Sequence, residues 1–121
     1  VLSEQPYSFK ARFEDETGKS GTNPEELLGA AHAGCFTMQL SALLAKEGHP
    51  AERLETKSIV AVEPAEGGGF EIVSSHLQLS GSVPGIDHDT FMKIANEAKS
   101  GCPVSKALGG VEISMEAKLN S

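Results

Sequence analysis

Residues 23–36 read NPEELLGAAHAGCF, and this stretch decides the fold because it opens the longest apolar segment of the chain. Asn23 suits the N-cap, and Pro24 suits the first helical position because its missing N–H has no intrahelical partner there. Glu25 lies in the first turn, where the helix dipole favours an anion. Apolar residues continue almost to Gly48, which suits the C′ position. The pattern predicts one helix of about 35 Å, apolar nearly all round and therefore buried on most sides.

Four other segments have the pattern of strands. Residues 7–13 and 111–119 alternate apolar and polar side chains, which is the period of a half-buried strand. Residues 54–63 and 69–83 have the pattern of the two arms of a hairpin, joined by a turn at Glu66-Gly67-Gly68-Gly69.

Two further helices are expected before the last strand. The first lies between Asp87, a capping residue, and Gly101. Pro103 suits the first position of a short helix through Leu108, which places Cys102 at an N-cap-like position where the dipole stabilises a thiolate. The order of strand, long helix, hairpin, helix, short helix and strand predicts an α+β fold with a mainly antiparallel sheet. We expect a single domain over residues 1–121.

The charge and hydropathy of the chain argue against several classes of partner. The 121 residues include 17 acidic and 10 basic side chains, for a formal net charge of −7. Nucleic acids and anionic membrane surfaces attract clustered Lys and Arg, so neither is an expected partner. No apolar run approaches the ~18–20 residues that span a bilayer, and no signal peptide pattern opens the chain. We therefore expect a cytoplasmic protein.

Two cysteines, Cys35 and Cys102, leave three interpretations open. They are small buried side chains, a structural disulfide, or a redox pair. A structural disulfide suits a secreted domain, for which the sequence gives no sign. The absence of a CxxC spacing argues against a thioredoxin-type motif.

A reactive Cys35 needs a nearby cation, because burial in the middle of a helix raises the pKa of a thiol. Within the helix the candidate is His32. Elsewhere Arg12 stands out because it interrupts an aromatic-rich strand segment. It is either part of a solvated strand face or a guanidinium folded over the thiol and oriented by a carboxylate such as Glu25.

His32 also has alternatives of its own. A Cys–His pair three residues apart makes the nucleophile of some hydrolases, but a histidine in a core or an interface is the more common case. A zinc site would need four ligands, drawn from Cys35, Cys102, His32 and one of His49, His76 or His88. No ligand spacing in the sequence supports that zinc site.

Four segments of this chain resemble one known family. They are residues 21–36, 83–87 and 98–108, together with residues 5–13. These segments resemble the OsmC/Ohr family, the osmotically induced and organic hydroperoxide resistance proteins, and residues 5–13 favour its OsmC branch. The resemblance covers essentially the whole chain. The family usually has one more β-hairpin before the position of Val1, and that N-terminal hairpin is missing from this sequence.

The resemblance implies a fold and a partner. Members of the family are intertwined homodimers in which the long central helices are wrapped by antiparallel sheets from both subunits. Their active sites lie at the subunit interface. A homodimer is therefore expected here.

The resemblance also implies site residues and a reaction. The peroxidatic cysteine falls on Cys35, the resolving cysteine on Cys102, the thiolate-stabilising arginine on Arg12, and the glutamate that holds this arginine on Glu25. Organic hydroperoxides would be reduced to alcohols through a Cys35 sulfenic acid and a Cys35–Cys102 disulfide. An external dithiol, such as a dihydrolipoyl group, would reduce that disulfide, and no metal, flavin or haem would be required.

The apolar side chains of Phe36 and Met38 beside Cys35 are expected to favour organic hydroperoxides over hydrogen peroxide. Two rival functions use the same fold: a redox sensor without turnover and a binding module that has lost the activity. The acidic chain lacks a basic patch for DNA, which weighs against a transcriptional sensor.

Overall fold

The computed structural model describes residues 22–120. Along this part of the chain the elements are α1 (Pro24–Lys46), β1 (Arg53–Pro64), β2 (Phe70–Ser82), α2 (His88–Gly101), α3 (Pro103–Ala107) and β3 (Glu112–Asn120). Each lies within a few residues of the segment that predicted it. The strand predicted over residues 7–13 lies outside the described residues.

The long helix α1 begins and ends where its capping residues predict. The Asn23 side chain accepts a hydrogen bond from the Glu26 amide at 2.7 Å, and Pro24 occupies the first helical position. At the other end Glu47 is the C-cap and Gly48 has a φ of +83°, a left-handed conformation that glycine adopts without steric cost. The predicted helix is therefore confirmed at both ends.

The sheet has the order β1-β2-β3, and its two pairings differ in direction. β1 and β2 form the predicted antiparallel hairpin, with an irregularity between Ala61 and Val62. β2 and β3 pair in parallel, with Leu77 opposite Met115. The prediction of a mainly antiparallel sheet was therefore wrong for β3. The reason is that α2 and α3 form a crossover, which returns the chain to the end of the sheet where β2 began.

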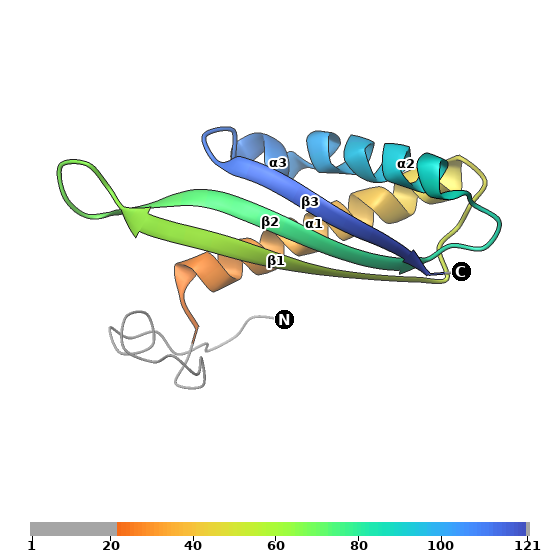
Figure 1. Cartoon of the computed structure of the whole chain (residues 1–121), viewed down its shortest axis with the longest axis horizontal. Coiled ribbons are helices and arrows are strands. Elements are labelled where there is room, and N and C mark those ends of the chain that lie inside the picture. The colour runs from red at the N-terminus through yellow and green to blue at the C-terminus, as the bar shows by residue number, and fades with distance from the viewer. Residues whose placement is uncertain (1–21, 121) are drawn as a thin grey trace.

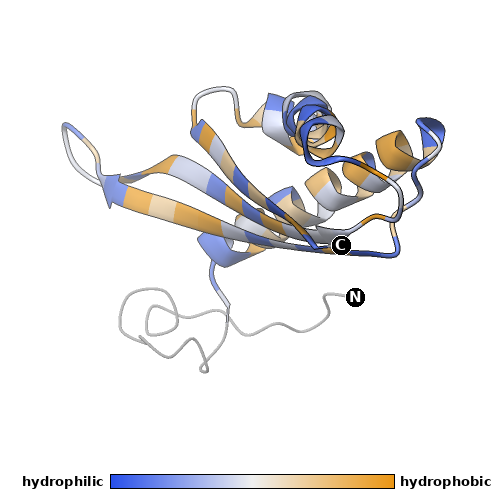
Figure 2. Ribbon diagram, turned by 45° about the vertical axis from the view of Figure 1, so that its right-hand side comes forward, coloured by the Kyte–Doolittle hydropathy of each residue, from blue (hydrophilic) through white to orange (hydrophobic). Residues whose placement is uncertain are grey.

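The helices lie together on one face of the sheet (Figures 1 and 2). The core between the two layers is apolar and consists of Phe36, Leu40, Leu44, Leu77, Leu79, Val83, Phe91, Ile94, Ala95, Ala98 and Cys102. At Gly81 α2 approaches the sheet closely, because a Cβ built there would lie 3.2 Å from Phe91 Cζ of α2 and 2.9 Å from Leu54 Cδ2 of the neighbouring strand β1. The β1–β2 hairpin extends beyond the helices (Figure 1).

α1 is less covered than its sequence predicts. One face of α1 forms a buried stripe that packs against the sheet and α2. It consists of Gly29, His32, Phe36, Leu40 and Leu44. The opposite face is open among residues 22–120, and Met38 is 76% exposed on it.

α1 is also long and apolar enough, by length and composition, to cross a membrane. An 18-residue window has a mean hydropathy of 1.4, and 28% of it is buried. The expectation that no segment approaches this length was wrong, because the average tolerates isolated polar residues such as His32. The core helix of a folded domain passes the same test.

Candidate thiol site

The fold brings the two cysteines together. Cys35 lies midway along α1, and Cys102 lies between α2 and α3. Because α1 packs against both of these helices, the two cysteines are neighbours in the fold although they are far apart in the sequence. The two thiols lie near enough for each to change the ionisation of the other, and both cysteines are free. Cys35 is partly exposed, whereas Cys102 is completely buried. An oxidant from solvent therefore meets Cys35 first.

The surroundings of Cys35 favour its protonated form. Burial raises the pKa of the Cys35 thiol, and the neighbouring Cys102 thiol raises it further. A hydrogen bond from the Val104 amide acts in the opposite direction without outweighing them. Among residues 22–120, the surroundings of Cys35 thus do not by themselves yield a thiolate.

The surroundings of Cys102 favour its ionised form. Burial acts to raise the pKa of this thiol, but the neighbouring Cys35 thiol and the polar groups of Ser105 outweigh burial and lower the pKa. Cys102 is the N-cap of α3, as its position before Pro103 predicts, although its side chain makes no strict capping bond. When one of the two thiols ionises, these surroundings favour Cys102 over Cys35 as the thiolate.

The predicted partners of Cys35 are not placed beside it within the described part of the chain. Arg12 lies outside the described residues. Glu25 lies in the first turn of α1 and lines a cleft of about 380 Å³ with Asn23, Glu26, Gly29, Ser58, Val60 and Val62. About 15 Å of helix rise separates Glu25 from Cys35. Glu25 of the same subunit therefore cannot be the carboxylate next to Cys35.

The apolar residues expected to flank Cys35 point in different directions. Phe36 is fully buried in the core and cannot line an open substrate site, so this part of the expectation was wrong. Met38 is one helical turn from Cys35 and is exposed. Of the two, Met38 is the side chain available to a substrate.

His32 is a buried histidine with both ring nitrogens occupied. Its Nδ1 lies 2.6 Å from Ser75 Oγ and its Nε2 lies 2.8 Å from Ser105 Oγ. Burial lowers its pKa, so the ring is neutral near pH 7. Neither nitrogen is left for Cys35 or for a metal ion, which argues against both the hydrolase pair and the zinc site. Within residues 22–120, no three His, Cys, Asp or Glu side chains are grouped to hold a metal.

Sequence reasoning missed the serines around His32. Ser75 is fully buried and Ser105 nearly so, and Ser58 lies 2.9 Å from Ser75, Oγ to Oγ. Single serines carry no recognisable motif. The sequence signal was weak: Ser74-Ser75 interrupts an apolar strand pattern, and a buried hydroxyl there requires a polar partner.

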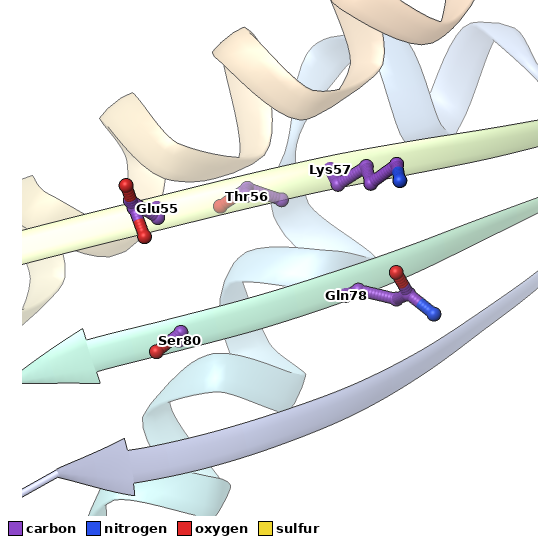
Figure 3. A pocket seen from close by; sticks show the side chains of 5 residues that line it. All are labelled: Glu55, Thr56, Lys57, Gln78 and Ser80. Carbon is purple, nitrogen blue, oxygen red and sulfur yellow. The ribbon is translucent and has the colours of Figure 1, made fainter.

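A shallow depression elsewhere on the molecule holds neither thiol. It has a volume of about 500 Å³ and is lined by Glu55, Thr56, Lys57, Gln78 and Ser80 of β1 and β2 (Figure 3). It is open to solvent, and Gln78 donates a hydrogen bond to Glu116 on the neighbouring strand at 2.7 Å. We assign it no function.

These observations define a class: an α+β protein in which a long helix presents one partly exposed thiol to a second, buried thiol. The family model described as OsmC-like protein matches residues 16–116. The chain belongs to this family.

Relatives and solved structures agree with that assignment. The chain is 46% identical over 121 residues to "Peroxiredoxin OsmC" of Escherichia coli (strain K12), covering 100% of this chain and 81% of the relative. It is 33% identical over 98 residues to the "Organic hydroperoxide resistance protein" of Xanthomonas axonopodis pv. citri, covering 77% and 63%. The crystal structure of an OsmC-like protein from Mycoplasma pneumoniae superposes with a TM-score of 0.77 at 14% identity, covering 88% and 78%, and shows the fold alone.

Proposed function

We propose that this protein is a thiol peroxidase that reduces organic hydroperoxides to alcohols. The observation that carries the proposal is the contact between a partly exposed Cys35 and a buried Cys102. The names of the peroxiredoxin and hydroperoxide resistance relatives support the same reaction. The whole chain, residues 1–121, acts as one domain in this proposal. Two free thiols fit the reducing conditions of the cytoplasm.

In the first step the Cys35 thiolate attacks the terminal oxygen of the hydroperoxide. An S–O bond forms, the O–O bond breaks, and the alkoxide takes a proton and leaves as the alcohol. The sulfur loses two electrons and the peroxide gains them. Cys35 is assigned this role because it is the thiol that solvent reaches, whereas Cys102 is closed off.

In the second step Cys102 attacks the Cys35 sulfenic acid. The S–S bond forms, the S–O bond breaks, and hydroxide leaves and takes up a proton. The lowered pKa of Cys102 favours this attack, because the thiolate is the nucleophile. An external dithiol, for which a dihydrolipoyl group is a candidate, then restores both thiols by exchange.

The raised pKa of Cys35 means that the first step needs a cation, and Arg12 is our candidate. A guanidinium stays charged when it is desolvated and holds a carboxylate with two hydrogen bonds. Glu25 is that carboxylate in our proposal. Because Glu25 and Cys35 of one chain are about 15 Å apart along α1, the partner's Glu25 fits better in a site shared by two subunits.

A homodimer also accounts for the open face of α1. On this face, mostly small residues at helical spacing form an exposed stripe. The stripe consists of Ala30, Ala31, Gly34, Met38 and Ala42. A second copy of this helix would cover the stripe. The projecting β1–β2 hairpin, with Phe70 62% exposed near its tip, would reach across the partner.

The test is hydroperoxide consumption by the purified protein with dihydrolipoamide or dithiothreitol. We expect many turnovers per protein with cumene hydroperoxide, none with Cys35→Ser, and slower attack with Arg12→Ala. Oxidation that stops after one equivalent in the wild-type protein would instead support a redox sensor. Unreactive thiols in a folded protein would support a binding module.

A further inference from the structure

A chain of buried hydrogen bonds runs from the cleft beside α1 toward Cys102. Ser58 lines that cleft, and its Oγ lies 2.9 Å from Ser75 Oγ. Ser75 Oγ lies 2.6 Å from Nδ1 of His32, whose Nε2 lies 2.8 Å from Ser105 Oγ. This series of hydrogen bonds connects β1, β2, α1 and α3. None of its four side chains has a role in the reaction proposed above.

Ser105, which holds the far nitrogen of His32, is also a neighbour of the Cys102 thiol within one turn of α3. Cys102 is the N-cap of α3, and Ser105 is three residues further, the position toward which an N-cap side chain points. The Ser105 hydroxyl and amide both act on the Cys102 thiol and favour its ionised form. A nearly buried hydroxyl thus stands between the histidine and the sulfur.

The hydrogen bonds can be ordered in one direction along this chain. A neutral imidazole has one N–H donor and one acceptor nitrogen. If Ser75 donates to Nδ1, then Nε2–H donates to the Ser105 oxygen, and the Ser105 O–H remains free to donate to Cys102. In the opposite order the Ser105 hydroxyl would donate its hydrogen to Nε2 of His32 and would have none left for Cys102. A negative charge on Cys102 selects the first order, because each donor then points toward the sulfur.

We propose that His32 is a positioning residue that orients Ser105 to donate its hydrogen to Cys102, so that Cys102 attacks Cys35 as a thiolate. The inference rests on the proposed function for its place in the reaction cycle, but the chemistry it describes is a property of the two thiols alone. In the attack the Cys102 sulfur forms the S–S bond and is oxidised, while the departing group takes the bonding electrons from Cys35.

The titratable and polar groups beside this series of hydrogen bonds come from α1, β1, β2 and α3. Cys35 of α1 meets Cys102, and Ser58 of β1, Ser75 of β2 and Ser105 of α3 supply the hydroxyls. In the described part of the chain, the hydrogen-bond partners of His32 are serines and not carboxylates or ammonium groups. A pH profile of Cys102 therefore reports on this thiol, Cys35 and His32, with Arg12 outside the described residues.

The reaction with dithiobis(nitrobenzoate), a coloured-thiolate reagent, isolates the Cys102 step from any peroxide. The partly exposed Cys35 attacks the reagent and releases one nitrothiophenolate, leaving a mixed disulfide on Cys35. Cys102 then attacks that mixed disulfide and releases the second nitrothiophenolate, so that the Cys35–Cys102 disulfide forms and the electrons balance. The rate of the second release, followed over a pH series, measures Cys102 as a nucleophile.

Ser105→Ala is the decisive variant, and Ser114→Ala is its matched control. Ser114 Oγ also lies 2.6 Å from a histidine nitrogen, Nδ1 of His76, but on β3 and away from both thiols. We expect Ser105→Ala to slow the second release about tenfold near neutral pH and to move its midpoint to higher pH. The first release, which reports on Cys35, should change much less than the second, and Ser114→Ala should match the wild-type protein in both.

Two substitutions of His32 separate its role from that of Ser105. In His32→Gln the side-chain amide reaches the Nε2 position and can still donate to Ser105, whereas in His32→Asn the shorter amide cannot. We expect the glutamine variant to keep most of the second-release rate and the asparagine variant to behave like Ser105→Ala. If His32→Asn does not fold, His32→Leu takes its place, because leucine fills a similar volume and has no N–H to donate to Ser105.

Equal second-release rates and midpoints in Ser105→Ala and Ser114→Ala would overturn the inference. A slow Ser105→Ala beside a folded His32→Asn with wild-type kinetics would overturn the role of His32. Failure of the proposed peroxidase appears elsewhere, as absent hydroperoxide turnover in the wild-type protein, while the two release rates are still measurable.

Discussion

Acid should destabilise this protein through His32 in particular. The ring is fully buried, and burial lowers its pKa in the folded state below the ordinary value of 6.5. As the pH falls below that value, the unfolded chain takes up a proton that the folded chain does not. The contribution of His32 to stability is therefore complete above about pH 6.5 and is lost as the pH falls toward the folded-state pKa.

The size of this effect has an upper limit. One proton of difference changes the free energy of unfolding by about 1.4 kcal/mol per pH unit. Between about pH 7.5 and pH 5.5, integration over an ordinary histidine pKa gives at most about 1.4 kcal/mol. The two serine hydroxyls can accept hydrogen bonds from a doubly protonated ring, so the cost is the desolvation of its charge and not a lost hydrogen bond.

The assay is urea unfolding at these two pH values, at one protein concentration, for the wild-type protein and His32→Gln. Other carboxylates and histidines titrate in both proteins, so their effects cancel in the comparison. We expect the wild-type protein to lose up to about 1.4 kcal/mol more than the variant on acidification. The same loss in both proteins would refute the reasoning that the buried ring resists protonation.

Three further substitutions test the packing. Gly81→Ala should cost about 1–3 kcal/mol in urea unfolding, because the new Cβ would press on Leu54 and Phe91; an unchanged midpoint would show that the layers yield at this point. Leu40→Ala removes a fully buried side chain and should cost about 2–5 kcal/mol by the same measurement, so a loss below 1 kcal/mol would contradict its place in the core. Met38→Asp should weaken self-association in sedimentation without loss of helical circular dichroism, and an unaltered oligomeric state would remove the α1 stripe from the proposed interface.

The local elements were predictable from sequence because each is marked by residues with one dominant conformational role. Asn23 and Pro24 mark the start of α1, Gly48 marks its end, and Asp87 accepts a hydrogen bond from the Thr90 amide at 2.7 Å at the start of α2. The direction of β3 was not predictable in this way. Parallel and antiparallel partners show the same alternation of side chains, so direction depends on how the connecting helices cross the sheet.

The two cysteines of the candidate site were predictable from sequence, whereas the serines around His32 were not. Cys35 and Cys102 stand in recognisable segments, and the fold places them in contact. The partners of His32 come from three separate elements, so the chain of serines has no local sequence signal. The acidity of the thiols also depends on these tertiary contacts. The roles of Arg12 and Glu25 stay predictions.

The most direct test of the central claim is a single-turnover experiment with one equivalent of cumene hydroperoxide and the reduced protein. Mass spectrometry of the intact protein and its peptides counts the products. The account predicts one alcohol per chain, a mass lower by two hydrogens, and a peptide pair joined through Cys35 and Cys102. Peroxide that remains unconsumed, or a product whose two thiols are still free, would contradict it.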